Sequence, residues 1–341
     1  MFNTRGGSIN GTDKKDRHEK LTTTSFGTTD RGPHTLLVIA LASALIVSDA
    51  VGVAVPLSTL VAGLTLGVLV VGLPHGGLDQ RVGLRLLKNF RPLVAWILFV
   101  VAYLAVAGIV IMGWFLEPRF TILSFFGLAA WHFGLEEESR PFTTPISRLA
   151  MIARGGMVIW IPAYFQGQSV SDLLTIIFPS GSLDIAQQVV ADIQFIAPAM
   201  LILLAYDAIC RREPAEKLSI GSINIPFHQL RIATFALLFA TASPLISFGV
   251  YFCCWHSIIG LANLRRQFSL TTTELATKLF PISSAAIVLF LIGFAISRIE
   301  NPFTPAMLQT MFIGLSALAV PHLLLHVISD IHRLDSNGMS R

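Results

Sequence analysis

Five histidines lie in or at the ends of long apolar stretches of the sequence, namely His75, His132, His256, His322 and His326. Titratable side chains are costly in such surroundings, so each histidine is a candidate for function. The alternative is that each one hydrogen-bonds to a neighbouring helix. Imidazole nitrogens suit Fe, Zn, Cu or Ni, and four of them around an octahedral ion leave two positions for other ligands. The residues therefore predict a transition-metal centre, and a haem held by two histidines would use the same residue types.

Three carboxylates follow histidines of this set at helical spacing, and one of them is Asp330, four residues after His326. Asp79 comes four residues after His75, and Glu136 comes four residues after His132. On a continuous helix, that offset places both groups on one face. A metal-bound histidine usually donates its second N–H to a carboxylate or a carbonyl. We therefore expect Asp79 and Glu136 to orient the imidazoles that precede them.

The composition of the chain indicates which class of protein contains these histidines and carboxylates. Of 341 residues, 53% are hydrophobic and only 13% are charged, and the mean hydropathy is +0.69. A soluble globule needs a more strongly charged surface, so we predict an integral membrane protein in contact with the lipid bilayer. The net charge of +4 comes from Lys and Arg in short patches with no basic stripe, so we expect no nucleic-acid partner.

Apolar stretches of about 20 residues predict an all-α bundle of membrane-spanning helices. Eight stretches are clear, and they cover residues 35–54, 57–74, 93–116, 120–135, 146–166, 193–210, 280–297 and 305–329. We expect residues 1–34 to form a disordered polar tail, residues 35–330 to form the membrane domain, and residues 331–341 to form a short C-terminal tail.

The stretch 230–262 decides the topology. It is too long for one upright helix, and Pro244 lies in its middle. A single crossing would place Arg265, Arg266 and Lys278 on the outer side, against the tendency of basic residues to remain in the cytoplasm. Two short helices around Pro244 would place them inside. We therefore predict about ten segments with both termini cytoplasmic, and nine if the stretch crosses once. With ten segments, the four histidine motifs share the cytoplasmic half of the membrane.

Four short motifs carry a resemblance to a known family. They are Pro74-His75-Gly76-Gly77-Leu78-Asp79, Trp131-His132-Phe133-Gly134, Tyr251-Phe252 followed by His256-Ser257, and Pro321-His322-Leu323-Leu324-Leu325. In their order and their positions at segment ends, over roughly residues 35–330, they resemble the Brp/Blh family of membrane β-carotene 15,15′-dioxygenases.

The resemblance implies a multi-pass enzyme of the cell membrane with a non-haem Fe(II) held by histidines. Its expected ligands are His75, His132 and His256, with His322 as the fourth. Such an enzyme uses O₂ to cleave the central double bond of β-carotene into two molecules of retinal. A retinal acceptor such as a microbial rhodopsin is an implied partner.

One position departs from the family pattern. There, a second histidine follows the His-Ser pair after two further residues, and here that position is Gly260. Either His322 completes the site with His326 as a near neighbour, or the activity is lost or altered.

Five aromatic residues flank the histidine motifs, namely Trp131, Phe133, Tyr251, Phe252 and Trp255. They could line the path of an apolar substrate, or they could be ordinary packing of Phe-rich helices.

Two other functions fit the intramembrane polar residues. One is a haem-bearing electron-transfer protein. The other is a transporter of metal ions or small solutes, in which the histidines and Asp49 line a pathway. Asp49 could also form an ion pair with Arg154, and Glu136 is another candidate partner for that arginine.

Overall fold

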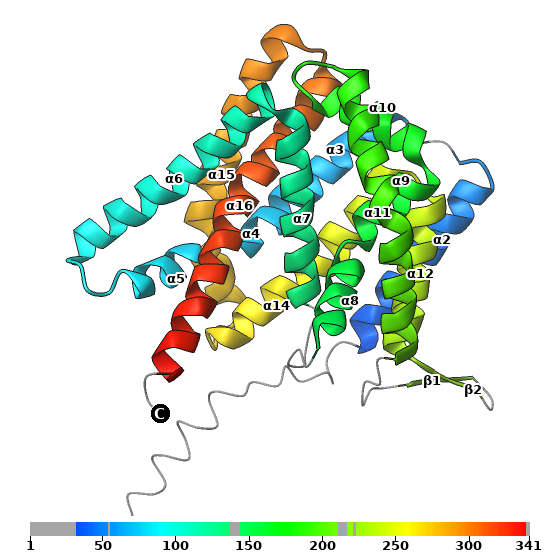
Figure 1. Ribbon diagram of the computed structural model, residues 1–341. Coiled ribbons are helices and arrows are strands. Elements are labelled where there is room, and N and C mark those ends of the chain that lie inside the picture. Colours follow the sequence, from blue (N-terminus) through cyan, green and yellow to red (C-terminus); the bar gives the residue numbers. More distant parts are fainter. Residues whose placement is uncertain (1–31, 54, 137–143, 211–216, 221–222, 339–341) are drawn as a thin grey trace, which may run out of the picture.

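The chain folds as a bundle of helices. The computed structural model describes residues 32–53, 55–136, 144–210, 217–220 and 223–338. Within these residues, the only strands form one short antiparallel hairpin, β1 (Lys217–Ile220) and β2 (Ile223–Pro226). The helices pack side by side (Figure 1), so the expected helical fold class is confirmed. The predicted N-terminal tail lies almost entirely outside the described residues.

Among the described residues, seven helical segments are long and apolar enough to cross a membrane. They are Pro33–Ala50, Leu57–Leu86, Pro92–Leu116, Leu183–Cys210, Pro244–Gln267, Thr272–Glu300 and Phe303–Ser329. An eighth would be the pair α8 (Pro145–Gly155) and α9 (Met157–Phe165), which is bent by 65°. This set is compatible with a multi-pass membrane protein, but the predicted count of about ten is not confirmed.

Two of the predicted segments are helices that fall short of this set. Helix α12 (Phe227–Thr241) is only 15 residues long. Helix α7 (Pro118–Glu136) has 19 residues, but polar side chains such as Arg119 dilute its apolar character. The predicted break at Pro244 is present, because α12 ends before it and a new helix begins at that proline. Proline is favoured in the first turn of a helix, where its missing N–H has no partner to lose.

Two segments of π-helix interrupt the spans that carry the first and third histidine motifs. The segment η2 (Val68–Gly72) follows α3 (Leu57–Gly67) and leads into α4 (Leu73–His75). The segment η3 (Val250–His256) follows α13 (Pro244–Gly249) and leads into α14 (Ser257–Gln267). Pro74 explains η2, because its ring cannot fit against the carbonyl four residues earlier in a regular α-helix. Such π-segments are frequent at functional sites.

Glycines allow these two π-helical regions to approach closely. A Cβ at Gly72 would come within 2.6 Å of Phe252 Cε1, and a Cβ at Gly67 would come within 2.9 Å of Cys253 Sγ. Larger side chains at either position would hold η2 and η3 apart. The short separation brings His75, which ends α4 directly after η2, and His256, which ends η3, into one region of the bundle.

Helix α16 (Phe303–Gly338) is the hub of this half of the bundle. It packs against α3, against α6 (Pro92–Leu116), against α15 (Thr272–Glu300) and against α10 (Gly167–Ile177). It continues to Gly338, through most of the stretch expected to be a C-terminal tail. Helix α11 (Leu183–Cys210) packs with α7, α8, α9 and α10 on the other side. The remaining helices are α2 (Gly32–Ala50) and α5 (Asp79–Leu86).

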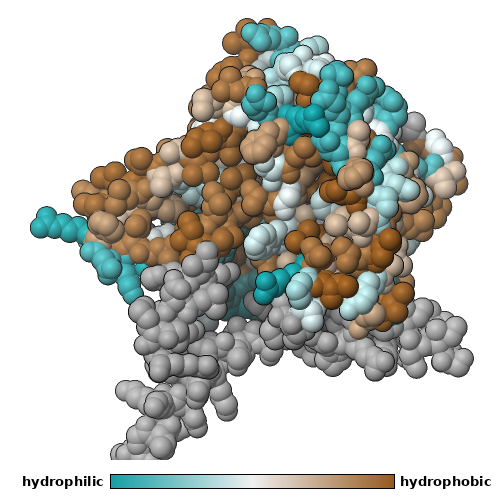
Figure 2. Space-filling view, viewed as in Figure 1, coloured by the Kyte–Doolittle hydropathy of each residue, from teal (hydrophilic) through white to brown (hydrophobic). Residues whose placement is uncertain are grey.

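The surface over α6 is almost entirely apolar. Figure 2 shows hydrophobic side chains covering this helix, where it leans away from the bundle in Figure 1. In water such a surface would be unfavourable, whereas lipid chains match it.

Candidate metal centre

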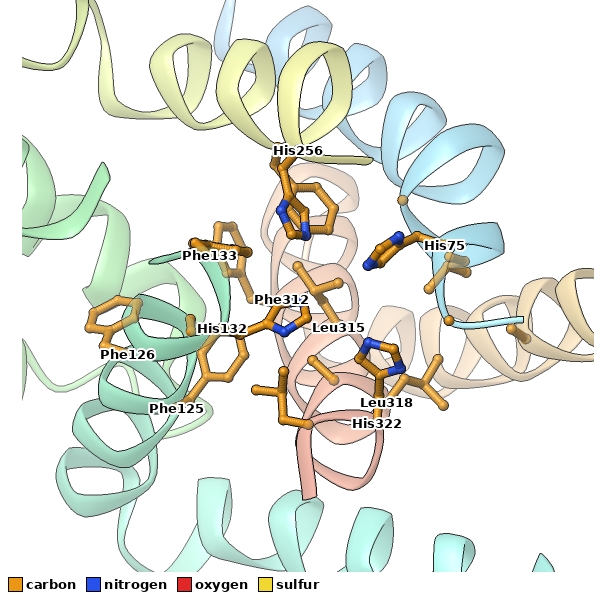
Figure 3. A pocket seen from close by; sticks show the side chains of 18 of the residues that line it. His75, Phe125, Phe126, His132, Phe133, His256, Phe312, Leu315, Leu318 and His322 are labelled. Atoms are coloured by element: carbon orange, nitrogen blue, oxygen red, sulfur yellow. The ribbon is translucent and has the colours of Figure 1, made fainter. Parts of the chain in front are cut away.

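Four imidazoles from four separate segments meet in the interior of the bundle. His75 ends α4, His132 lies in α7, His256 ends η3 and His322 lies in α16. The ring centroid of His75 is 5.1 Å from that of His256 and 5.5 Å from that of His322. The centroid of His132 is 5.4 Å and 5.5 Å from the same two rings. Figure 3 shows all four rings around one space, so the structure brings together the four histidines selected from the sequence.

Several nitrogens of this cluster have no hydrogen-bond partner within the described part of the chain. Both ring nitrogens of His75 and Nε2 of His322 are buried without a hydrogen-bond partner among the described residues. Buried polar atoms are nearly always paired, because leaving them unpaired costs free energy. A divalent cation between the rings would satisfy these atoms, and neutral imidazole nitrogens are suitable donors for it. The residues present therefore fit a metal ion.

Glu136 adds a carboxylate to the cluster. Its Oε2 lies 2.7 Å from Nδ1 of His256, and its Oε1 lies 3.6 Å from Nε2 of His75. The expectation that Glu136 orients His132 is wrong. The four-residue offset does place both side chains on the same face of α7, but that face meets η3 and α4, so the carboxylate bonds across to another segment. Donor atoms of Glu136, His75, His132 and His256 all lie within 4.8 Å of one another.

Asp79 also bonds to a histidine other than the expected one. Its Oδ1 lies 2.7 Å from Nδ1 of His322, whereas we expected it to orient His75. The chain turns at Gly76 and Gly77 between α4 and α5, so His75 and Asp79 do not share a helical face. The contact to Asp79 leaves Nε2 of His322 available on the other side of the ring.

Tyr103 holds Asp79 in place, and the sequence analysis missed it. Its hydroxyl contacts Asp79 Oδ2 at 3.1 Å and the carbonyl oxygen of Leu318 at 3.0 Å. Tyr103 belongs to α6 and Leu318 to α16, so this hydroxyl ties two helices to the carboxylate that orients His322.

His326 lies beside the cluster. Its ring is 4.6 Å from that of His322, and its Nε2 is 3.9 Å from Asp79 Oδ1. Its side chain is 41% exposed, unlike the buried histidines. Asp79, His322 and His326 form a second group of potential donors, so His322 is a member of this group and also faces the first one.

Position 260 faces the cluster directly. A Cβ on Gly260 would run into the imidazole of His75 and come within 2.9 Å of Glu136 Oε1. The missing side chain is therefore what allows His75 and Glu136 to occupy this space.

A cavity of about 420 Å³ runs past the four imidazoles, and its walls are mainly apolar. Of the five aromatic residues chosen from the sequence, Phe133 and Phe252 line it. The other three aromatic residues do not line the cavity, contrary to the expectation. Trp131 lies outside the lining and is 47% exposed, while Tyr251 and Trp255 are buried in the core on the other side of η3. Because helical neighbours point in different directions, proximity to a motif in sequence did not place these side chains in the cavity.

Other aromatic residues line the cavity instead. Trp96, Phe99 and Tyr103 of α6 contribute to one side. Their spacing of three and four residues places them on one helical face, a signal that the sequence contained. Phe125, Phe126, Phe248 and Phe312 also line it.

The buried arginine has a different partner from those expected. A guanidinium nitrogen of Arg154 lies 2.7 Å from Oδ2 of Asp207, instead of pairing with Asp49 or Glu136. Both side chains are buried, and His228 Nε2 lies 3.6 Å from the same carboxylate oxygen. This ion pair joins α8 to α11, beside the segment that carries His132.

The comparisons with known proteins agree on one family. A family model described as beta-carotene 15,15'-dioxygenase matches residues 66–329. A curated beta-carotene 15,15'-dioxygenase from uncultured marine bacterium 66A03 is 30% identical over 271 residues, which cover 76% of this chain and 90% of that protein. No solved structure matches the chain significantly.

The close approach of His75 to Gly260 predicts the effect of placing a histidine at position 260, as in the family pattern. Gly260→His should lower bound metal per protein, because the new side chain would displace His75 and Glu136. Gly63→Ala in α3 is the matched control, since a Cβ there meets nothing within 4 Å. Metal analysis of purified protein measures both. More metal in the Gly260→His variant than in the parent would contradict this view of the packing.

The hydroxyl of Tyr103 should matter through His322. Tyr103→Phe removes one hydrogen bond to Asp79 and keeps the ring in the cavity wall. Loss of such an outer partner typically costs about 10- to 100-fold in metal affinity or activity. Titration with a competing chelator would measure the change, and Phe99→Leu on the same face of α6 is the control. An unchanged affinity in Tyr103→Phe would mean that Asp79 holds its position without this bond.

Proposed function

The chain belongs to the β-carotene 15,15′-dioxygenase family, and we propose from that premise that it cleaves the central double bond of β-carotene with O₂. The products are two molecules of retinal. The observation that best supports this proposal is the cluster of four imidazoles in the wall of an apolar cavity. A carotenoid is a long hydrocarbon, and such a cavity can bury it beside a metal-binding group without water.

In this proposal, His75, His132, His256 and His322 hold an Fe(II) ion. The iron supplies the binding and activation of O₂. Two of the ligands are oriented from outside by carboxylates. Glu136 accepts from Nδ1 of His256, and Asp79 accepts from Nδ1 of His322. These bonds leave Nε2 of each ring for the metal, as is usual for metal-bound histidine.

The protein's own contribution is to hold the polyene and exclude water. Phe133 lies against the cluster, with its ring centroid 4.4 Å from that of His256, and Phe252 is 5.7 Å from the same imidazole. Flat aromatic faces offer a polyene a large contact area without polar groups. His326 and the hydroxyl of Tyr103 remain outside the set of proposed ligands and position Asp79 and His322.

The location in the cell follows from the same chemistry. We place the enzyme in the cell membrane because its substrate and products dissolve in lipid, and we place both termini in the cytoplasm because the distribution of Lys and Arg favours that orientation. Retinal released there could pass to an acceptor in the same bilayer, such as a rhodopsin.

Activity is tested in a bacterium that accumulates β-carotene. Expression of the chain should bleach the orange colour and produce retinal, measured by chromatography. His132→Ala should abolish retinal formation, because it removes a nitrogen facing the cluster. His18→Ala, in a polar part of the sequence outside the described residues, is the control and should retain activity. If the parent chain accumulates in the membrane while β-carotene persists, the proposed reaction is wrong.

Iron content distinguishes the role of Glu136 from that of His322. If His322 is the fourth ligand, His322→Ala should lose most of the bound iron. Glu136→Gln should retain it, since the amide oxygen can still accept from His256. Loss of iron in Glu136→Gln together with retention of iron in His322→Ala would make Glu136 the ligand and His322 dispensable. Elemental analysis of the purified variants measures both, with His326→Ala as the neighbouring control.

A further inference from the structure

The cavity wall contains three exposed residues among those that line it, and all three come from two helices. Trp96 and Leu104 of α6 are 43% and 56% exposed, and Ala285 of α15 is also exposed. A side chain that both lines a cavity and reaches the outer surface marks an opening. The opening therefore lies between α6 and α15.

The packing of the helices explains why an opening forms there. Both α6 and α15 pack extensively against α16, but they scarcely contact each other. Helix α16 thus forms the floor of a lateral gap. These two helices are also the least buried spans, with 11% and 6% of their most apolar window inside the protein. Exposed side chains of α15 such as Phe280, Val288 and Ile292 are apolar, and Figure 2 shows an apolar surface over α6. Lipid chains would therefore border the gap on both sides.

Away from α6 and α15, no described residue of the cavity wall is exposed, although Val158, Val170 and Leu173 are half-buried. The walls that come from α9, α10 and α11 include Pro162, Leu174, Ile177 and Ile193. All four are buried, with Leu174 at 4%, Ile177 at 3% and Ile193 at 1% exposure. Within the described part of the chain, the gap between α6 and α15 is therefore the one place where exposed residues line the cavity.

The path between these two helices is lined mainly by apolar side chains. Phe99 of α6 and Ile282 and Ala286 of α15 line it behind the exposed residues. Two polar groups of α6 lie along this route, namely the indole N–H of Trp96 at the exposed mouth and the hydroxyl of Tyr103, which contacts Asp79 and Leu318. A hydrocarbon chain that enters from lipid would therefore leave the hydroxyl of Tyr103 paired with its partners.

We propose that the gap between α6 and α15 is the portal through which the polyene passes between the bilayer and the metal centre. This inference rests on the proposed function and specifies how its substrate reaches the site. Because the substrate moves from one hydrocarbon environment to another, entry requires no transfer through water. Since exposed residues line the cavity only at this gap within the described part of the chain, the products leave through the same portal.

Ala285→Trp tests the portal by filling the mouth from α15. The control is Val288→Trp, on the same helix at a position 54% exposed that does not line the cavity. Both variants are compared with the parent in lipid vesicles loaded with β-carotene. The measurements are iron per protein, carotenoid bound under anaerobic conditions, and the initial rate of retinal formation after O₂ is added.

If the portal lies between α6 and α15, the iron content is the same in the parent, in Ala285→Trp and in Val288→Trp. Carotenoid binding in Ala285→Trp becomes slower by roughly tenfold or more, because entry now requires α6 and α15 to separate. Retinal formation falls in parallel, and Val288→Trp behaves as the parent does. Leu104→Trp fills the mouth from α6 and gives the same result as Ala285→Trp.

Binding and turnover in Ala285→Trp and Leu104→Trp equal to those of Val288→Trp would overturn the portal. Failure of the proposed function is distinguishable from failure of the portal, because it would appear in the parent protein without any substitution. A parent that binds carotenoid through an unblocked mouth but forms no retinal would leave the portal in place and refute the reaction. A parent that neither binds nor cleaves carotenoid would refute both.

Discussion

The contact between His75 and the bare backbone of Gly260 is the constraint on which the metal centre depends. The ring of His75 occupies the space that a side chain at position 260 would fill, and from there it reaches the other three imidazoles. This approach requires the helices that carry His75 and His256 to lie very close together, and Gly67 and Gly72 allow that. Two π-helical segments then adjust the direction of each chain as it enters the cluster. Small residues and irregular helices thus serve one purpose here, which is to bring nitrogen donors from separate segments into one small space.

Charge is distributed around the imidazoles in an ordered way. Each of two carboxylates bonds to Nδ1 of a histidine on another segment, at 2.7 Å in both cases. Such bonds fix the ring orientation and increase the basicity of the nitrogen on the far side. They also connect helices that are distant in sequence, since Asp79 precedes His322 by 243 residues. The same bonds that prepare the donors therefore stabilise the packing of α5, α7 and η3 around α16.

The position of the cluster in the cavity wall determines where a bound apolar molecule would meet polar atoms. Its walls are almost free of polar groups except at the imidazoles and the carboxylates behind them, so an apolar molecule inside it meets polar atoms at one place. Exposed residues border it at α6 and α15, whereas its lining at α9, α10 and α11 is buried or half-buried. The arrangement suits a reaction on a hydrocarbon chain, for which burial provides both binding and protection from water.

The sequence by itself determined the helical class, the apolar character, the break at Pro244 and the identity of the four clustered histidines. These follow from local properties, namely hydropathy, proline geometry and the cost of a titratable group in an apolar stretch. Tertiary structure alone decided the partners of Asp79 and Glu136, the role of Tyr103 and the side chains that line the cavity. It also decided that Gly260 makes room for His75. The physical reason is that spacing along one helix fixes which residues share a face, whereas the angle and separation of packed helices fix what that face meets.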